Sequence, residues 1–150
     1  MGRIRMLLAP VVATLALGLA ACGGSGDGGA APAPAGDDAW AALLAELGLE
    51  PGDGTLTIEA TGAAPSLAVT ISVAPDAAGP VTFSDGLYGA QAFALGDDGW
   101  ERVDTAEVRT EIAPILEPGG SATLDLPVAE ADGYRVLVPA EGLAYWADVS

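Results

Sequence analysis

Few side chains of this 150-residue sequence could do covalent chemistry. It has one cysteine, Cys22, and neither histidine nor lysine. Without an imidazole or an amine, the Ser-His, Cys-His, Ser-Lys and Schiff-base systems of nucleophilic catalysis cannot be built. The 21 acidic residues leave carboxylate pairs, which glycosidases use at separations of about 5 to 9.5 Å. Among so many acids some pair meets that spacing by chance, so we expect a protein that is not an enzyme and has no cofactor.

Carboxylates are also the ligands that calcium prefers. Asp97 and Asp98, with Asp85 upstream, are the nearest candidates, but no spacing resembles an EF-hand loop. An Asp-Asp-Gly run is more often simply a hairpin turn. Weak calcium binding and a plain turn stay open as alternatives, and we assign no metal ligand.

The segment that ends at Cys22 indicates where the protein resides. Arg3 and Arg5 precede an apolar run over residues 6–19, which is too short for a helix to span hydrocarbon about 30 Å thick but suits the core of a signal peptide. The run ends in Leu-Ala-Ala-Cys at residues 19–22. This sequence resembles the lipobox of bacterial lipoproteins. The resemblance implies cleavage before Cys22, a diacylglycerol on its sulfur, and a lipid anchor at the extracytoplasmic face of the cell membrane.

The strength of such an anchor follows from its acyl chains. Each buried methylene contributes about 0.8 kcal/mol, so two or three chains hold durably where one holds marginally. The alternative is an ordinary secretory signal with an incidental cysteine. The only cysteine of the chain stands at the position that the lipobox requires, which favours the lipoprotein.

Charge excludes several partners. Once residues 1–21 are removed, three arginines face all 21 acids, a formal charge of −18. Nucleic acid and anionic lipid surfaces would repel such a chain, so we expect no nucleic-acid partner. High external salt would screen the self-repulsion. A soluble export from a GC-rich genome would have the same composition, and melting temperatures across a salt series separate these two hypotheses.

Composition divides the chain into four parts. Residues 1–21 are predicted to be the signal peptide. Residues 22–36 are the lipidated cysteine and a Gly/Ala/Pro linker with a root-mean-square reach of roughly 20 Å. Residues 37–54 are a short amphipathic helix and a turn, and residues 55–150 are one β domain.

The helix is predicted over residues 38–47. Asp37 or Asp38 can cap it, and an apolar stripe recurs with the helical period at Trp40, Leu43, Leu44 and Leu47. Gly48 suits the left-handed position after a helix, and Leu49 can then fold back on Leu44. The stripe either closes one end of the following sheets or is an exposed docking face.

From Thr55 the apolar period changes to two, which predicts strands. Alternation is clearest at residues 67–73 and recurs, with turns every 8 to 12 residues, at 55–59, 81–84, 90–95, 100–103, 108–112, 122–126, 134–138 and 143–149. Asp98-Gly99 supplies the positive φ values that a tight hairpin needs. Seven to nine short strands of this kind are typical of an all-β, two-sheet antiparallel sandwich, with one short helix before it.

Several runs in order carry a second resemblance. They are Val-Thr-Ile-Ser-Val at 69–73, Gly-Pro-Val-Thr-Phe at 79–83, Asp-Gly-Trp-Glu-Arg-Val at 98–103, Leu-Glu-Pro-Gly at 116–119 and Gly-Tyr-Arg-Val at 133–136. Together they resemble bacterial immunoglobulin-like domains of exported lipoproteins, over residues 55–150. The resemblance implies an immunoglobulin-like fold and a surface location, and no particular chemistry.

Aromatic residues give the only sign of a contact surface. In residues 143–149, Tyr145 alternates with Trp146, which places Trp146 on the face opposite the expected core. An exposed tryptophan there would suit a partner contact, and the terminal strand could offer its edge. The alternative is that the helix stripe, Trp40 included, covers it. Tyr134 follows Asp132-Gly133 as in the tyrosine corners of sandwich folds, and we interpret it as structural.

These observations predict a lipid-anchored, non-enzymatic immunoglobulin-like module that acts in envelope interaction or assembly with an unidentified envelope protein. The alternative is an exported proteinase inhibitor or a small ligand-binding lipoprotein.

Overall fold

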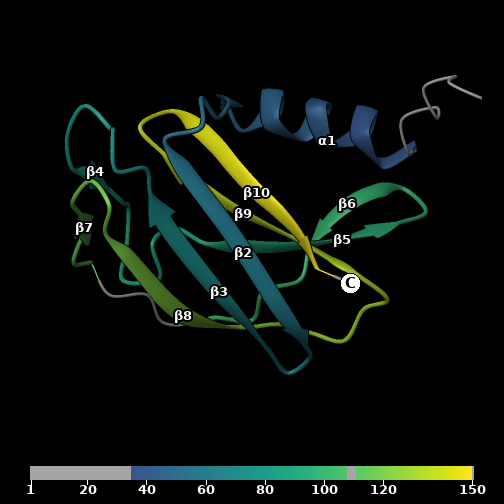
Figure 1. Ribbon diagram of the computed structural model, residues 1–150. Coiled ribbons are helices and arrows are strands. Elements are labelled where there is room, and N and C mark those ends of the chain that lie inside the picture. The colour runs from purple at the N-terminus through teal and green to yellow at the C-terminus, as the bar shows by residue number, and fades with distance from the viewer. Residues whose placement is uncertain (1–34, 108–110, 150) are drawn as a thin grey trace, which may run out of the picture. The chain divides into compact units, whose positions relative to one another are not determined.

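The computed structural model describes residues 35–107 and 111–149. Cys22, the signal peptide and most of the linker lie outside the described residues, as does most of the strand predicted at 108–112. The described chain is mainly β-structure with one short helix, which confirms the all-β class (Figure 1). Its elements in order are α1 Ala35–Glu46, β1 Glu50–Pro51, β2 Leu56–Ala63, β3 Ser66–Val73, β4 Val81–Thr82, β5 Gln91–Gly96, β6 Gly99–Arg102, β7 Ile115–Leu116, β8 Ser121–Pro127, β9 Tyr134–Ala140 and β10 Leu143–Val149.

The strands form two main sheets. The larger has the order β1-β10-β9-β5-β6, the second is β2-β3-β8, and β4 pairs with β7 in a separate two-stranded ladder. All pairings are antiparallel except that of β1 with β10. On one side of the domain β2 packs beside β10, so the edges of the two sheets approach each other there (Figure 1).

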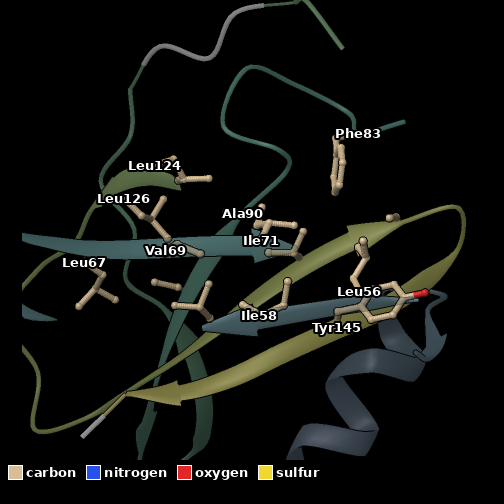
Figure 2. Packing of buried hydrophobic residues seen from close by; sticks show 14 of the residues in the cluster. Leu56, Ile58, Leu67, Val69, Ile71, Phe83, Ala90, Leu124, Leu126 and Tyr145 are labelled. Atoms are coloured by element: carbon tan, nitrogen blue, oxygen red, sulfur yellow. The ribbon is translucent and has the colours of Figure 1, made fainter. Parts of the chain in front are cut away.

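The main core lies between the two sheets (Figure 2). Alternation in β3 places Leu67, Val69 and Ile71 in this core with no exposed surface, while the residues between them face outward. Strands β8, β9 and β10 contribute Leu126, Val136 and Tyr145 from their inward positions. The period of two predicted from the sequence therefore sets the core face of each long strand.

Helix α1 covers the other face of the five-stranded sheet and forms a second, smaller core. This core contains Trp40 and Leu44 from the helix with Phe93, Leu137 and Ala144 from the sheet. The domain thus has three layers: the three-stranded sheet, the five-stranded sheet and the helix (Figure 1).

The C-terminal end of α1 is fixed by a Schellman motif. Leu49 N–H donates to the Leu44 carbonyl at 2.9 Å, and Gly48 N–H donates to the Ala45 carbonyl at 3.1 Å. Gly48 has φ of +69°, the left-handed conformation that glycine adopts without a Cβ clash. Leu49 packs in the same cluster as Leu44, as the sequence predicted.

The start and the stripe of the helix differ from the prediction. The helix begins at Ala35, so Asp37 and Asp38 lie in its first turn and are not its cap. Acidic residues are favourable both at the cap and in the first turn, because both positions lie at the positive end of the helix dipole. The sequence alone therefore could not distinguish a cap from a first-turn position. Leu47 is 44% exposed and does not belong to the buried stripe, because the chain turns away immediately after it.

Two of the three two-residue strands were not predicted: the residues of β1 were assigned to the turn after the helix, and Leu116 of β7 to another turn. The third, β4, lies within the strand predicted over residues 81–84 and is shorter than predicted. Two residues contain no measurable period, so only tertiary pairing defines such strands. At the β5–β6 hairpin only Gly99 has a positive φ, +122°, because Asp97 and Asp98 form a turn that does not need one.

Candidate functional site

The outer face of β9 and β10, beneath α1, gathers the polar and aromatic side chains that the fold brings together. In the antiparallel register Arg135 stands opposite Asp148, and Leu137 opposite Trp146. These four residues alternate with core residues along their strands, so all face the helix. This face is where the sequence placed Trp146.

Arg135 is the only polar or charged residue buried within the described chain, at 7% exposure. Its guanidinium carbon lies 5.0 Å from the ring centroid of Trp40 and 4.7 Å from that of Trp100. A cation held over an aromatic face and shielded from water gains about 2 kcal/mol or more from the quadrupole of the ring. The two rings therefore replace part of the hydration that the guanidinium loses on burial.

Two carboxylates complete the surroundings of Arg135. Its Nε donates to Asp148 Oδ1 at 2.5 Å and its Nη2 donates to Asp148 Oδ2 at 2.9 Å, a bidentate pair. Both terminal nitrogens also lie 3.4 Å from Asp37 Oδ1 in the first turn of α1. Hydrogen bonding to Asp148 raises the pKa of Arg135, although burial opposes the rise, so the group is charged at every physiological pH.

Trp40 lies at the centre of the aromatic cluster. It makes edge contacts with Phe93, Trp100 and Trp146, at centroid distances of 5.6, 5.2 and 5.9 Å. Its indole N–H is buried without a hydrogen-bond partner among the described residues. A buried donor of this kind costs about 1–3 kcal/mol, so ring packing must hold Trp40 in place.

Trp100 fastens the first turn of α1 to β6. Its indole N–H donates to the Gly36 carbonyl at 2.7 Å. A Cβ on Gly36 would lie 2.9 Å from the Leu95 side chain and 3.3 Å from the Trp100 ring. A side chain at position 36 would therefore require the exposed Leu95 side chain to shift.

The sequence left open whether Trp146 is exposed or is covered by the helix. Its ring contacts Trp40, so the helix covers it in part, yet it is 36% exposed. Both alternatives are thus partly correct: Trp146 supports the helix and also presents a surface.

A groove of about 670 Å³ runs between α1 and the β1–β10 side of the sheet, and we call it the α1 groove. It is lined by Asp37, Trp40, Ala41, Leu44 and Ala45 from the helix, Leu49, Glu50 and Pro51 from the segment after it, and Arg135, Trp146 and Asp148 from the sheet. Its volume falls within the range of about 300–1,000 Å³ that is typical of ligand pockets. Apolar walls with a few charged groups give it the character of a binding site.

A separate contact fixes the segment that leaves the groove. The hydroxyl of Tyr145 donates to Asp53 Oδ1 at 2.8 Å, and Thr55 N–H donates to the same oxygen at 2.9 Å. Hydrogen bonds from Thr55 and then from Tyr145 lower the pKa of Asp53 to about 2. This contact ties the β1–β2 connection to β10.

The calcium candidates do not form a site in the described structure. Asp85 Oδ1 accepts hydrogen bonds from Leu87 N–H at 2.9 Å and Gly89 N–H at 3.0 Å, which shapes a turn. Asp97 and Asp98 form the tip of the β5–β6 hairpin. Within residues 35–107 and 111–149, no group of three or more acidic, cysteine or histidine side chains is placed to hold a metal ion.

The sequence analysis found Trp146 but not Arg135. Period-two alternation places Arg135 on the face of Leu137 and opposite the core face of Tyr134 and Val136, and that signal was available in the sequence. What the sequence could not show is that Trp40, Trp100 and Asp148, from distant segments, meet at this arginine.

Comparison with known proteins adds no relative: no protein family model, curated protein or solved structure matches this chain. Among the described residues there is also no helix that is long and apolar enough to cross a membrane.

Replacing Trp40 tests the role of the aromatic cluster. We expect Trp40→Ala to lower the free energy of unfolding by about 3–5 kcal/mol, because it removes three ring contacts and the cover of Arg135. Trp40→Phe should cost clearly less, since it keeps a ring and removes the unpaired N–H. Urea denaturation measures both, with Leu47→Ala, at an exposed position just after the helix, as a control expected within about 0.5 kcal/mol of wild type. Equal losses for Trp40→Phe and Trp40→Ala would contradict this interpretation.

Asp53 should make stability depend on acid pH. Its pKa is about 2 in the folded protein, against about 3.9 in an unfolded chain, so the unfolded state binds the proton first. The stabilisation that the ionised Asp53 carboxylate contributes to the folded state is complete above about pH 4 and is lost as the pH falls towards 2. Denaturation midpoints of wild type and Asp53→Asn should therefore converge between pH 4 and 2. A constant difference across that window would show that the carboxylate charge is not responsible.

Proposed function

We propose that this protein is a lipid-anchored, non-enzymatic binding module of the bacterial cell envelope, built on an immunoglobulin-like sandwich. The anchoring part rests on the sequence of residues 1–22. The binding part is carried by one structural observation, the α1 groove with the partly exposed ring of Trp146 on its wall.

Strand order supports the immunoglobulin-like part of the proposal. If β2, β3, β5, β8, β9 and β10 are lettered A, B, C, E, F and G, the two sheets read A-B-E and G-F-C, which is the order of immunoglobulin constant-type sheets without strand D. The parallel strand β1, the strand β6 beyond C and the separate β4–β7 ladder are additions to that plan.

A tyrosine corner supports it independently. Tyr134 begins β9, and its hydroxyl donates to the Ala129 carbonyl at 3.0 Å and accepts from Ala131 N–H at 3.1 Å. In immunoglobulin-like sandwiches a tyrosine near the start of strand F makes this type of bond to the backbone a few residues upstream. Tyr134 has both the position and the bond.

Residue chemistry supports a role without catalysis. The chain has neither histidine nor lysine, and the predicted fate of its one thiol is acylation. In the groove the only basic group, Arg135, is already paired with Asp148 and Asp37. The side chains that line the groove are therefore suited to recognise a partner and not to transfer protons or chemical groups.

A second candidate function is the binding of a small molecule, as in substrate-binding lipoproteins. The groove volume of about 670 Å³ favours it, because this space suits a drug-sized ligand. In that case the same anchor would hold a ligand carrier and not an assembly module.

Replacement of Cys22 tests the anchor. We expect the native protein to carry acyl mass and to partition into membranes, whereas Cys22→Ser should carry none and stay in the aqueous phase, because the predicted lipidation begins at the sulfur of Cys22. Intact mass spectrometry and detergent-phase partitioning measure the two properties. As a matched control, Ser25→Ala changes the linker but not the cysteine and should behave as wild type. Native protein that is cleaved but not acylated would overturn the anchor.

A further inference from the structure

The α1 groove has an unbalanced charge. Three carboxylates line it, those of Asp37, Glu50 and Asp148, against the one guanidinium of Arg135. The side chains of Asp37 and Asp148 are 44% and 64% exposed although both pair with Arg135. Glu50 is exposed and makes no ion pair within the described residues. The groove therefore presents negative charge at its rim and accepts a cation more readily than an anion.

The rest of the chain strengthens that preference. The formal charge of the whole sequence is −16, so the long-range field attracts cationic partners and repels anionic ones. A second copy of this chain carries the same charge. Of its arginines in the described residues, Arg102 is paired with Asp104 and Arg135 is buried. Electrostatics thus disfavour a copy of the chain as the occupant.

The walls of the groove also offer apolar and aromatic surface to a partner. Trp146, Leu44 and Pro51 offer apolar surface, and the Trp146 ring has an exposed part that can stack on a cation or an aliphatic chain. Arg135 already shows this chemistry inside the domain, where a guanidinium lies between tryptophan rings and carboxylates. A basic side chain from outside would meet the same types of group at the rim.

The length of the groove fits an extended peptide. Its helix wall runs from Asp37 to Ala45, and the eight steps between these residues rise about 12 Å in an α-helix. Extended chain covers that distance in about four residues. Ala41 and Ala45 on this wall are small and solvent-exposed, so no large side chain of the helix fills the space.

We infer that the α1 groove binds an extended segment of a basic partner protein, in which an apolar side chain packs against Trp146 and Leu44 and an adjacent basic side chain reaches Glu50 and Asp148. This inference rests on the proposed binding function and names its partner class. It does not depend on the lipid anchor.

Peptide titration tests the inference. The probe is the blocked pentapeptide acetyl-Ala-Arg-Leu-Arg-Ala-amide, with versions that carry glutamine or glutamate in place of both arginines. The full chain, labelled with ¹⁵N-tryptophan and held in detergent, gives indole signals from its three tryptophans. We expect the arginine peptide to shift the Trp146 signal at low-millimolar concentration, with a much smaller change for Trp100, whose N–H is held by Gly36.

A pair of helix variants locates the binding. Ala41 lines the groove, whereas Ala42 is equally exposed on the same helix but lies outside it. Ala41→Gln should fill the groove and weaken the peptide at least about tenfold, and Ala42→Gln should leave it unchanged. Neither residue is buried, so both variants should fold, and unchanged melting temperatures check this. Glu50→Gln should weaken the arginine peptide about two- to fivefold and the glutamine peptide not at all.

Several outcomes would overturn the inference. They are no shift of Trp146 up to the low-millimolar range, equal binding of the glutamate peptide, equal loss for Ala41→Gln and Ala42→Gln, or a sedimentation result that shows the groove occupied by a second copy. Because the titration does not use the anchor, a protein without acyl mass that still binds the peptide would refute only the anchoring part of the proposed function. An acylated protein that ignores the peptide would refute this inference alone.

Discussion

The buried guanidinium of Arg135 determines how helix α1 lies on the five-stranded sheet. It joins the sheet to the first turn of the helix through Asp37, to the neighbouring strand through Asp148, and to the aromatic cluster through Trp40 and Trp100. Burial of a charge costs several kcal/mol, and only well-placed partners offset that cost. The arrangement consequently tolerates little displacement of any partner, which makes Arg135 a determinant of position more than a source of net stability.

The α1 groove follows from that arrangement. The helix is held at its first turn by Arg135 and Trp100 and at its end by the Schellman motif, and the side towards β1 and β10 remains open. The main core lies between the two sheets and shares no residue with the helix–sheet core. Substitutions at the groove rim therefore leave the packing of the sandwich intact, so a binding surface can vary while the fold is retained.

The sequence predicted those features that depend on local periodicity. The bounds of β10, the core face of β3 and the left-handed Gly48 follow from alternation and from turn chemistry, and the structure has each of them. It could not predict β1 and β7, whose two residues have no period, or the exposure of Leu47, which depends on the path of the chain beyond the helix. Of the candidate site, Trp146 was predicted, with Trp40 as its alternative cover, and the outward face of Arg135 follows from the same alternation. The rest of it needs tertiary register, since Arg135 meets Asp148 across 13 residues and Asp37 across 98.

Hydrogen exchange of the backbone amides tests most directly the claim that Arg135 holds the helix on the sheet. The comparison is between wild type, Arg135→Met and Arg102→Met, the last of which removes the ion pair between the half-exposed Arg102 and Asp104. We expect Arg135→Met to lower the protection of amides in α1 strongly, while amides of β3 keep most of their protection and Arg102→Met leaves α1 unchanged. If α1 keeps its full protection in Arg135→Met, or loses it only together with β3, the buried guanidinium does not position the helix.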